Sequence, residues 1–160
     1  MLRQDRYLLG MLVVIGLIVA AALGLFFTQT PRSYVPEDSP EDIVHNYAMA
    51  LSLEDYQKAY TYLAEAEGKP DFSKFRSTFS GFGELGNVGL QILEAESLDD
   101  QVLVDLVVIH GNTGLFDSGW REDSFASLVP DGPSWKIVQM PYPYWGFDWY
   151  QNDPALQKSP

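Results

Sequence analysis

An uncharged stretch of 21 residues near the N-terminus, YLLGMLVVIGLIVAAALGLFF, constrains this chain more than any other feature. As an α-helix it would be about 31 Å long, which matches the hydrocarbon thickness of a lipid bilayer. A buried helix of a soluble protein normally has a polar face, and the stretch from Tyr7 to Phe27 has none. We therefore expect a transmembrane anchor that contacts membrane lipid through residues 7–27.

The charges that flank this stretch predict its orientation. Arg3 and Arg6 precede it, and Arg32 is the first charge after it. The positive-inside rule then predicts a single-pass protein with a cytoplasmic N-terminus and an extracytoplasmic C-terminal domain. The alternative is a cleaved signal peptide with its cleavage site at residues 20–22, which are all alanine. Because the apolar character continues to Phe27, the uncleaved anchor is the favoured interpretation.

The rest of the chain is acidic and lacks cysteine. The net charge is −12, and every acidic residue except Asp5 lies after the apolar stretch. Such a surface repels nucleic acid, so we expect no nucleic-acid partner. Without cysteine, disulfides and thiol chemistry are excluded. A hydrophobic fraction of 46% is sufficient for a folded core.

The pattern predicts four segments: an N-terminus and anchor at 1–30, a proline-containing linker at 31–38, a folded domain at 39–140 and an aromatic tail at 141–160. Within the domain, helical spacing begins at Ser39 and again at Ser52, and Phe72, Phe75 and Phe79 predict a third, shorter helix.

After Gly86 the period of the apolar residues changes from that of a helix to that of a strand. Four strands are predicted, each separated from the next by a short turn, which requires antiparallel neighbours. The order of helices first and an antiparallel meander afterwards predicts an α+β domain whose helices cover one face of the sheet.

The segments PEDIVHNYAMALSLEDYQKAYTYLA and SWKIVQM resemble the opening helix pair and the closing strand of the nuclear transport factor 2-like superfamily, the cone-shaped fold shared with ketosteroid isomerase. The resemblance covers residues 39–140, and many bacterial members are membrane-anchored extracytoplasmic domains. It implies a pocket between the helices and a bent sheet, of a kind that often holds small apolar ligands. Some members are isomerases, dehydratases or hydrolases. The pocket residues that the resemblance implies here are Tyr47, Tyr60, Asp105 and Trp120.

Two residues are candidates for catalysis. Asp105 is predicted to share a strand face with Leu103, Val107 and Ile109, and a carboxylate among aliphatic side chains is suited to act as a general base. The alternative is that this face is the exposed side of the strand. His110 ends the same strand, where it would relay a proton or simply lie in solvent. The two histidines have no partner at metal-ligand spacing, so we expect no metal and no cofactor.

The motif GFGELG, residues 81–86, matches the G-x-G-x-x-G pattern of dinucleotide-binding loops. Such a loop follows a strand and opens a helix, so that the helix N-terminus faces the pyrophosphate. Here a phenylalanine-rich helix precedes the motif and a strand follows it. We therefore expect a connection between helix and sheet, and no dinucleotide.

The tail contains the segment PYPYWGFDWY, with six aromatic residues in ten. Pro141 and Pro143 cannot donate to a sheet, so regular strand pairing should end here. Three destinations are open for the rings: a lid over the core, a contact with membrane or a partner, or a platform for a ring-shaped ligand. The predicted partner or membrane contacts are Tyr142, Tyr144, Trp145, Phe147, Trp149 and Tyr150.

Together these features predict a non-catalytic, membrane-anchored extracytoplasmic binding or accessory module of an envelope protein assembly. We expect its partner to be another protein or a second copy of the chain. Two alternatives remain: a carrier of a small hydrophobic ligand in the cone pocket, and a pocket enzyme of isomerase or hydrolase type with Asp105 or His110 as the base.

Overall fold

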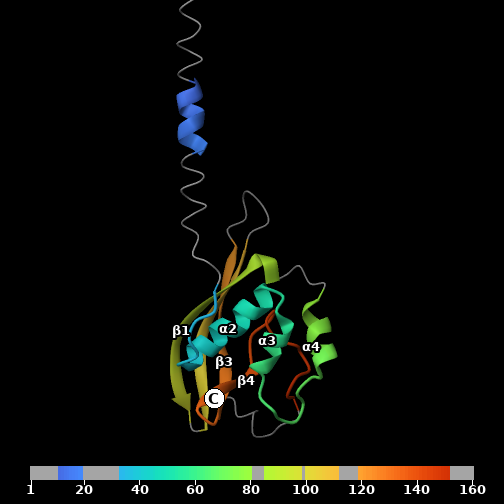
Figure 1. Cartoon of the computed structure of the whole chain (residues 1–160). Helices are drawn as coiled ribbons and strands as arrows, with labels where there is room; N and C mark the ends of the chain where they lie inside the picture. Colours follow the sequence, from blue (N-terminus) through green and yellow to red (C-terminus); the bar gives the residue numbers. More distant parts are fainter. Residues whose placement is uncertain (1–10, 20–32, 81–84, 99, 112–118, 152–160) are drawn as a thin grey trace, which may run out of the picture. The chain divides into compact units, whose positions relative to one another are not determined.

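The structure, a computed structural model, describes residues 11–19, 33–80, 85–98, 100–111 and 119–151 (Figure 1). The chain divides into two compact units, Met1–Ser33 and Tyr34–Pro160. In the first unit residues 11–19 are helical, and their large apolar side chains are 47% to 67% exposed. No helix within the described residues is both long and apolar enough to cross a bilayer. The remainder of the predicted anchor lies outside the described residues.

The second unit begins with three helices, as the sequence predicted. Helix α2, Pro40–Ser52, starts at a capping box in which the Ser39 side chain accepts from Asp42 N and Asp42 accepts from Ser39 N. Helix α3, Tyr56–Thr61, starts at Asp55. The predicted second start at Ser52 was therefore wrong by three residues. Ser52 ends α2, and Glu54 has a positive φ of 57°, which a continuing helix does not allow.

Helix α4, Phe72–Phe79, starts at Asp71 and is followed by a short 3₁₀ turn, Leu85–Asn87. This turn contains the end of the glycine motif and leads directly into a strand, as expected for a connection between helix and sheet. Residues 81–84 of the motif lie outside the described residues.

Four strands follow: β1 Val88–Leu98, β2 Gln101–His110, β3 Trp120–Asp131 and β4 Ser134–Gln139. They form one sheet in the order β1-β2-β3-β4, with every neighbouring pair antiparallel. The predicted meander and the α+β class are confirmed. The predicted turns at residues 99–100 and 111–114 lie partly outside the described residues. The last turn is the two-residue connection of Gly132 and Pro133, where Gly132 has a φ of 61°.

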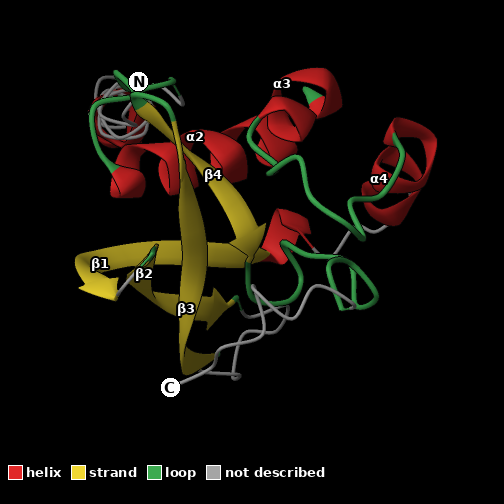
Figure 2. Cartoon of the chain, turned by 90° about the horizontal axis from the view of Figure 1, so that it is seen from below, coloured by secondary structure: helices red, strands yellow, loops and turns green. Residues whose placement is uncertain are grey.

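One face of the sheet packs against the helices (Figure 2). Alternate residues of β2 point to this inner face, and their partners on β3 and β4 do the same. The core formed with α2 and its neighbours is apolar and fully buried; its sheet members include Val104, Leu106, Val108, Ala126, Leu128 and Ile137, and its α2 members include Ile43, Val44, Tyr47 and Leu51.

The two edge strands of the sheet, β4 and β1, are protected from further pairing in different ways. Along β4, the amide of Ile137 donates to Tyr62 O at 2.8 Å, and Ala64 N donates to Ile137 O at 3.0 Å. The segment after α3 therefore covers this edge as a short parallel bridge. At the other edge, β1 has an irregularity between Ile92 and Ala95, and the charged side chains of Glu94 and Glu96 are exposed there. Bulges and charges of this kind discourage further strand pairing.

Within the segment predicted as a linker, 31–38, Val35 and Glu37 form hydrogen bonds with the domain. Asn46 of α2 is fully buried; its Nδ2 donates to Val35 O at 2.8 Å and its Oδ1 accepts from Val35 N at 2.9 Å. Tyr62 OH also donates to Glu37 at 2.7 Å. Residues 34–38 are therefore part of the folded unit, because a buried amide fixes their main chain.

Candidate functional site

Residues 141–151, the described part of the aromatic tail, fold back over the core, and we call them the lid. Tyr144, Trp149 and Tyr150 are only 5%, 4% and 4% exposed, and Trp145 is half-buried. Of the three predicted destinations, the structure shows the lid. The expectation that these buried rings contact a partner or membrane is therefore corrected, since the interior of their own domain covers them. Tyr142 and Phe147, at 64% and 94% exposed, are the two tail rings that remain at the surface.

The rings of the lid pack as two connected groups. Trp149 stacks on Phe75 of α4 with ring centres 5.4 Å apart, and it meets Phe79 edge-on at 5.8 Å. Trp145 stacks on Tyr150 at 5.7 Å and meets Trp149 edge-on at 4.9 Å. Offset stacks and edge contacts are the favoured arrangements of aromatic pairs, so the lid is well packed.

Hydrogen bonds fix the lid to three elements. Tyr47 OH in α2 donates to Tyr144 O at 2.8 Å, and Tyr144 OH donates to Val88 O at the start of β1 at 3.1 Å. Tyr150 OH donates to Ala64 O at 2.6 Å. At the surface, Lys74 of α4 forms a 2.6 Å ion pair with Asp148.

The phenol groups of Tyr144 in the lid and Tyr47 beneath it are protonated donors at neutral pH. Burial raises the pKa of Tyr144 to about 12 and that of Tyr47 well above its ordinary value. A phenolate at these positions would lose its hydration without gaining a cation. Neither group is suited to proton transfer at physiological pH, and both serve to hold the lid.

Two glycines allow the lid to approach closely. A Cβ on Gly146 would lie 2.1 Å from Cε2 of Trp149, so only glycine fits there. Gly68 has a φ of +88°, and a Cβ there would lie 2.8 Å from Cα of Tyr150. The amide of Tyr150 donates to Gly68 O at 3.1 Å. The main chain at the end of the lid therefore packs directly against the main chain of the α3–α4 connection.

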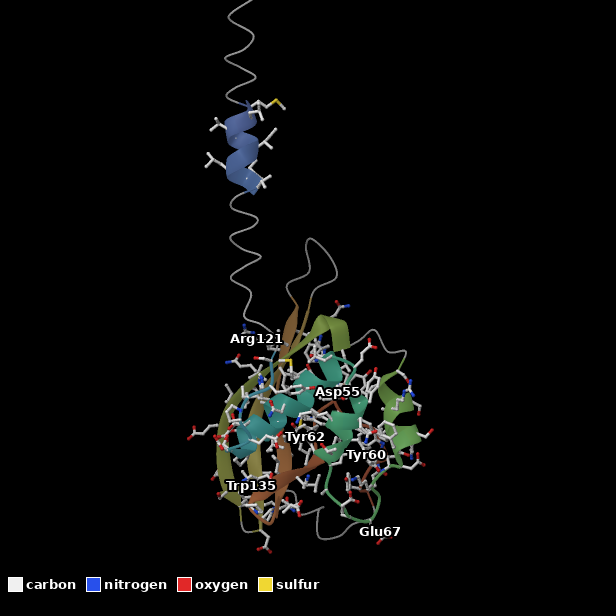
Figure 3. The ribbon with its side chains drawn as sticks, in the orientation of Figure 1. Asp55, Tyr60, Tyr62, Glu67, Arg121 and Trp135 are labelled. Carbon is white, nitrogen blue, oxygen red and sulfur yellow. The ribbon has the colours of Figure 1, made fainter. Side chains whose placement is uncertain are left out.

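The four predicted pocket residues lie in different parts of the domain. Tyr47 lies in the core beneath the lid. Tyr60 donates to Pro70 O at 2.9 Å and packs edge-on against Phe72 and Phe75. Trp120 is the first residue of β3 and precedes Arg121, which is labelled in Figure 3. Asp105 lies on the opposite face of the sheet.

Asp105 is exposed, between buried neighbours that point to the inner face. It pairs with Phe125 of β3, whose register places both on the outer face of the sheet. The alternative named from the sequence, an exposed strand face, is what the structure shows. Asp105 itself is therefore not buried, although a general-base role depended on a dry environment for its carboxylate.

His110 is stacked rather than free in solvent. Its ring lies parallel to that of Trp120, with centres 3.8 Å apart and planes inclined by 5°. The Nε2 atom is buried without a hydrogen-bond partner and lies 3.7 Å from Oε2 of Glu122. We name His110, Trp120 and Glu122 the aromatic corner. Sequence reasoning found His110 and Trp120 separately and missed Glu122; the β2–β3 register, which pairs His110 with Trp120, is the signal that joins them.

A second polar group was not predicted from the sequence. Tyr62 donates to Glu37, Lys58 pairs with the same carboxylate at 3.2 Å, and its ammonium lies 5.0 Å from the ring centre of Tyr34. The bond from Tyr62 holds the pKa of Glu37 below its usual range, and burial together with Glu37 raises that of Tyr62 to about 12. This group attaches residues 34–37 to α3, so its role is structural. Within the described residues no three His, Asp or Glu side chains gather in a way that could hold a metal ion.

Comparison with protein-family models and with curated proteins finds no match. Among solved structures, the chain is similar to a SEC-C motif containing protein from Rhodopseudomonas palustris, at 14% identity and a TM-score of 0.48 over 66% of this chain and 79% of that one. It is similar to an uncharacterised cystatin-fold protein from Novosphingobium aromaticivorans, at 14% identity and a TM-score of 0.42 over 63% and 98%.

A third similar structure comes from Campylobacter jejuni and is described as that of a nuclear transport factor 2-like transpeptidase; the identity is 18% and the TM-score 0.43, over 64% of this chain and 99% of that one. All three TM-scores are below 0.5. The description of the fold therefore rests on the helices and strands of this chain itself.

Proposed function

We propose that the protein is a non-catalytic, membrane-anchored extracytoplasmic module that binds another protein. The apolar stretch at 7–27 supports the anchor, because it carries no charge over a length that matches a bilayer. Its described part, residues 11–19, is helical and exposes its apolar side chains, including Leu12 and Leu17 at 67% and 66%. Lipid is an environment in which such a surface is stable.

The observation that carries the proposal is the position of the lid. In a cone of helices and sheet, the space between them is where a carrier or an enzyme would hold its ligand. Here Trp149 and Tyr150 of the chain itself pack into the core, and the hydroxyl of Tyr47 is already engaged with Tyr144. Binding through the outer surface is therefore favoured over binding in an interior pocket.

Phe147 is the part of the lid best placed to contact a partner. It is 94% exposed, although the residues around it are held by the Lys74–Asp148 ion pair and by a hydrogen bond from Gln151 to Phe147 O. A rigid turn loses little conformational entropy on binding, and exposed aromatic rings often anchor protein interfaces. We propose that Phe147 inserts into an apolar pocket of the partner.

Two experiments test the proposal in cells. Carbonate extraction and protease added to spheroplasts should find the full chain in the membrane with residues 34–160 accessible from outside. A photo-crosslinking side chain, Phe147→p-benzoylphenylalanine, should join the protein to one dominant partner. The same group at Glu67, which is also exposed, should not. A soluble or protease-protected chain would contradict the anchor, and equal crosslinking at both positions would contradict the contact.

A further inference from the structure

The aromatic corner has the geometry of a binding site for a cation. It lies where β2 ends and β3 begins, with His110 and Trp120 directly paired across the two strands and Glu122 two residues along β3. Because side chains two residues apart on a strand share a face, Trp120, Glu122 and His110 all point to the same side of the sheet. Three chemically different groups therefore meet at one exposed point.

Trp120 is stacked on one side and is still accessible. One face of the indole is covered by the parallel His110 ring at 3.8 Å, while the residue as a whole is 57% exposed. The exposed part of Trp120 must then be the opposite face and the ring edge. The His110 side chain is only 19% exposed, so the imidazole is the inner ring and the indole the outer one. An aromatic face fixed in this way needs no ordering when a ligand stacks on it.

A carboxylate that pairs with no lysine or arginine among the described residues lies on the same face of the sheet as this ring. Glu122 is 53% exposed, and its Oε2 lies 3.7 Å from Nε2 of His110, which is too distant for a hydrogen bond. Over the described ranges, Lys58, Lys69 and Lys74 each neutralise another acidic side chain, and neither lysine nor arginine pairs with Glu122. The corner thus presents a carboxylate and an aromatic ring on one face of the sheet.

We propose that the aromatic corner binds an arginine side chain from a basic segment of the partner protein, and this inference rests on the proposed function. The guanidinium stacks on the free face of Trp120 while Glu122 accepts its N–H groups. Tryptophan attracts cations more strongly than the other aromatic side chains, and guanidinium both stacks on rings and pairs with carboxylates. The net charge of −12 favours a basic partner and repels an acidic one.

The test uses the full chain in a neutral detergent and a defined probe, an acetylated and amidated Gly-Arg-Gly-Arg-Gly peptide. Titration followed by ¹⁵N NMR should shift the indole N–H signal of Trp120 more than those of the other three tryptophans. A peptide with citrulline in place of arginine has the same shape without the charge and should give no such shift.

Substitutions decide whether the corner is responsible. Trp120→Ala and Glu122→Gln should each weaken binding at least about threefold, and Trp120→Phe should retain part of it. Glu67→Gln removes the same charge from an exposed position elsewhere and should change the affinity less than twofold. Melting temperatures establish which variants are folded. If Trp120→Ala does not fold, Glu122→Gln still tests the corner, because it changes only one exposed side chain.

Two results would overturn the inference: no selective shift of Trp120, or equal losses for Glu122→Gln and Glu67→Gln, which would show a general attraction to an acidic surface. Because the peptide titration involves neither membrane nor partner, its outcome is separate from that of the proposed function. A chain found in the cytosol would leave the corner untouched, and a failed titration would leave the anchor and Phe147 untouched.

Discussion

The hydroxyl of Tyr47, in the middle of α2, donates a 2.8 Å hydrogen bond to the main-chain oxygen of Tyr144, 97 residues further along the chain. Both residues are buried, so no water competes for this bond. It connects the first helix of the domain to the start of the lid. Helix, sheet and lid should therefore unfold as one cooperative unit.

We expect Tyr47→Phe to lower the free energy of unfolding by about 1–3 kcal/mol, because it removes the donor and leaves the carbonyl of Tyr144 buried and unsatisfied. Urea denaturation followed by circular dichroism measures this. Tyr56→Phe, the same change at a half-buried tyrosine of α3, is the control and should have little effect. An equal effect of the two substitutions would contradict a special role for the Tyr47 bond.

Truncation of Trp149 should lower the stability of the domain strongly, whereas truncation of Phe147 should hardly change it. Trp149→Ala removes a ring that packs on Phe75 and Phe79, and losses of about 3–5 kcal/mol are typical of such changes. Phe147→Ala removes a ring that contacts solvent and should change the stability by less than about 0.5 kcal/mol. Thermal melting of both variants checks the contrast. A stable Trp149→Ala protein would mean that the lid is not part of the core.

Gly146→Ala should be strongly destabilising, because its new methyl group would overlap the indole of Trp149. Overpacking of this kind costs about 1–3 kcal/mol and forces the rings of the lid to move. Gly86→Ala is the matched control, since a Cβ there meets nothing within 4 Å. Near-ultraviolet circular dichroism, which reports the packing of aromatic rings, should change for Gly146→Ala only.

Local patterns were sufficient to predict the architecture of the domain. The cap at Ser39, the spacing of Ile43, Val44 and Tyr47 and the alternation in β2 are each decided by neighbouring residues, and all three are confirmed. The start of α3 was misplaced, because the serine at position 52 looks like a cap although Glu54 turns the chain.

The candidate site was much less predictable. Whether an aromatic ring is exposed depends on long-range packing, and the sequence alone could not separate Phe147 from Trp149 two residues later. Both faces of β2 carry aliphatic residues, so the sequence does not show which face the helices cover. The exposure of Asp105 depends on that choice. The link between His110 and Glu122 required the β2–β3 register.

Asn46→Ala should release the segment that precedes α2. The amide side chain holds both the N–H and the C=O of Val35, and alanine would leave these groups without partners. We expect a loss of about 1–3 kcal/mol and faster proteolysis within residues 34–38. The neighbouring change His45→Ala, at a half-buried position of the same helix, is the control. Unchanged proteolysis in Asn46→Ala would show that other contacts hold the segment.

The domain should lose stability as the pH rises above 10. Tyrosines of the unfolded chain ionise near pH 10, whereas burial raises the pKa of both Tyr62 and Tyr144 to about 12 in the folded state. The unfolded state therefore loses these protons first, so the stability is complete below pH 10 and decreases as the pH rises from 10 to 12. Urea unfolding at pH 8, 10 and 11, with phenolate absorbance at 295 nm, should show ionisation and unfolding together. Phenolate signals from every tyrosine at pH 10 in a folded protein would contradict the buried positions of Tyr62 and Tyr144, and Tyr144→Phe should make the decrease less steep.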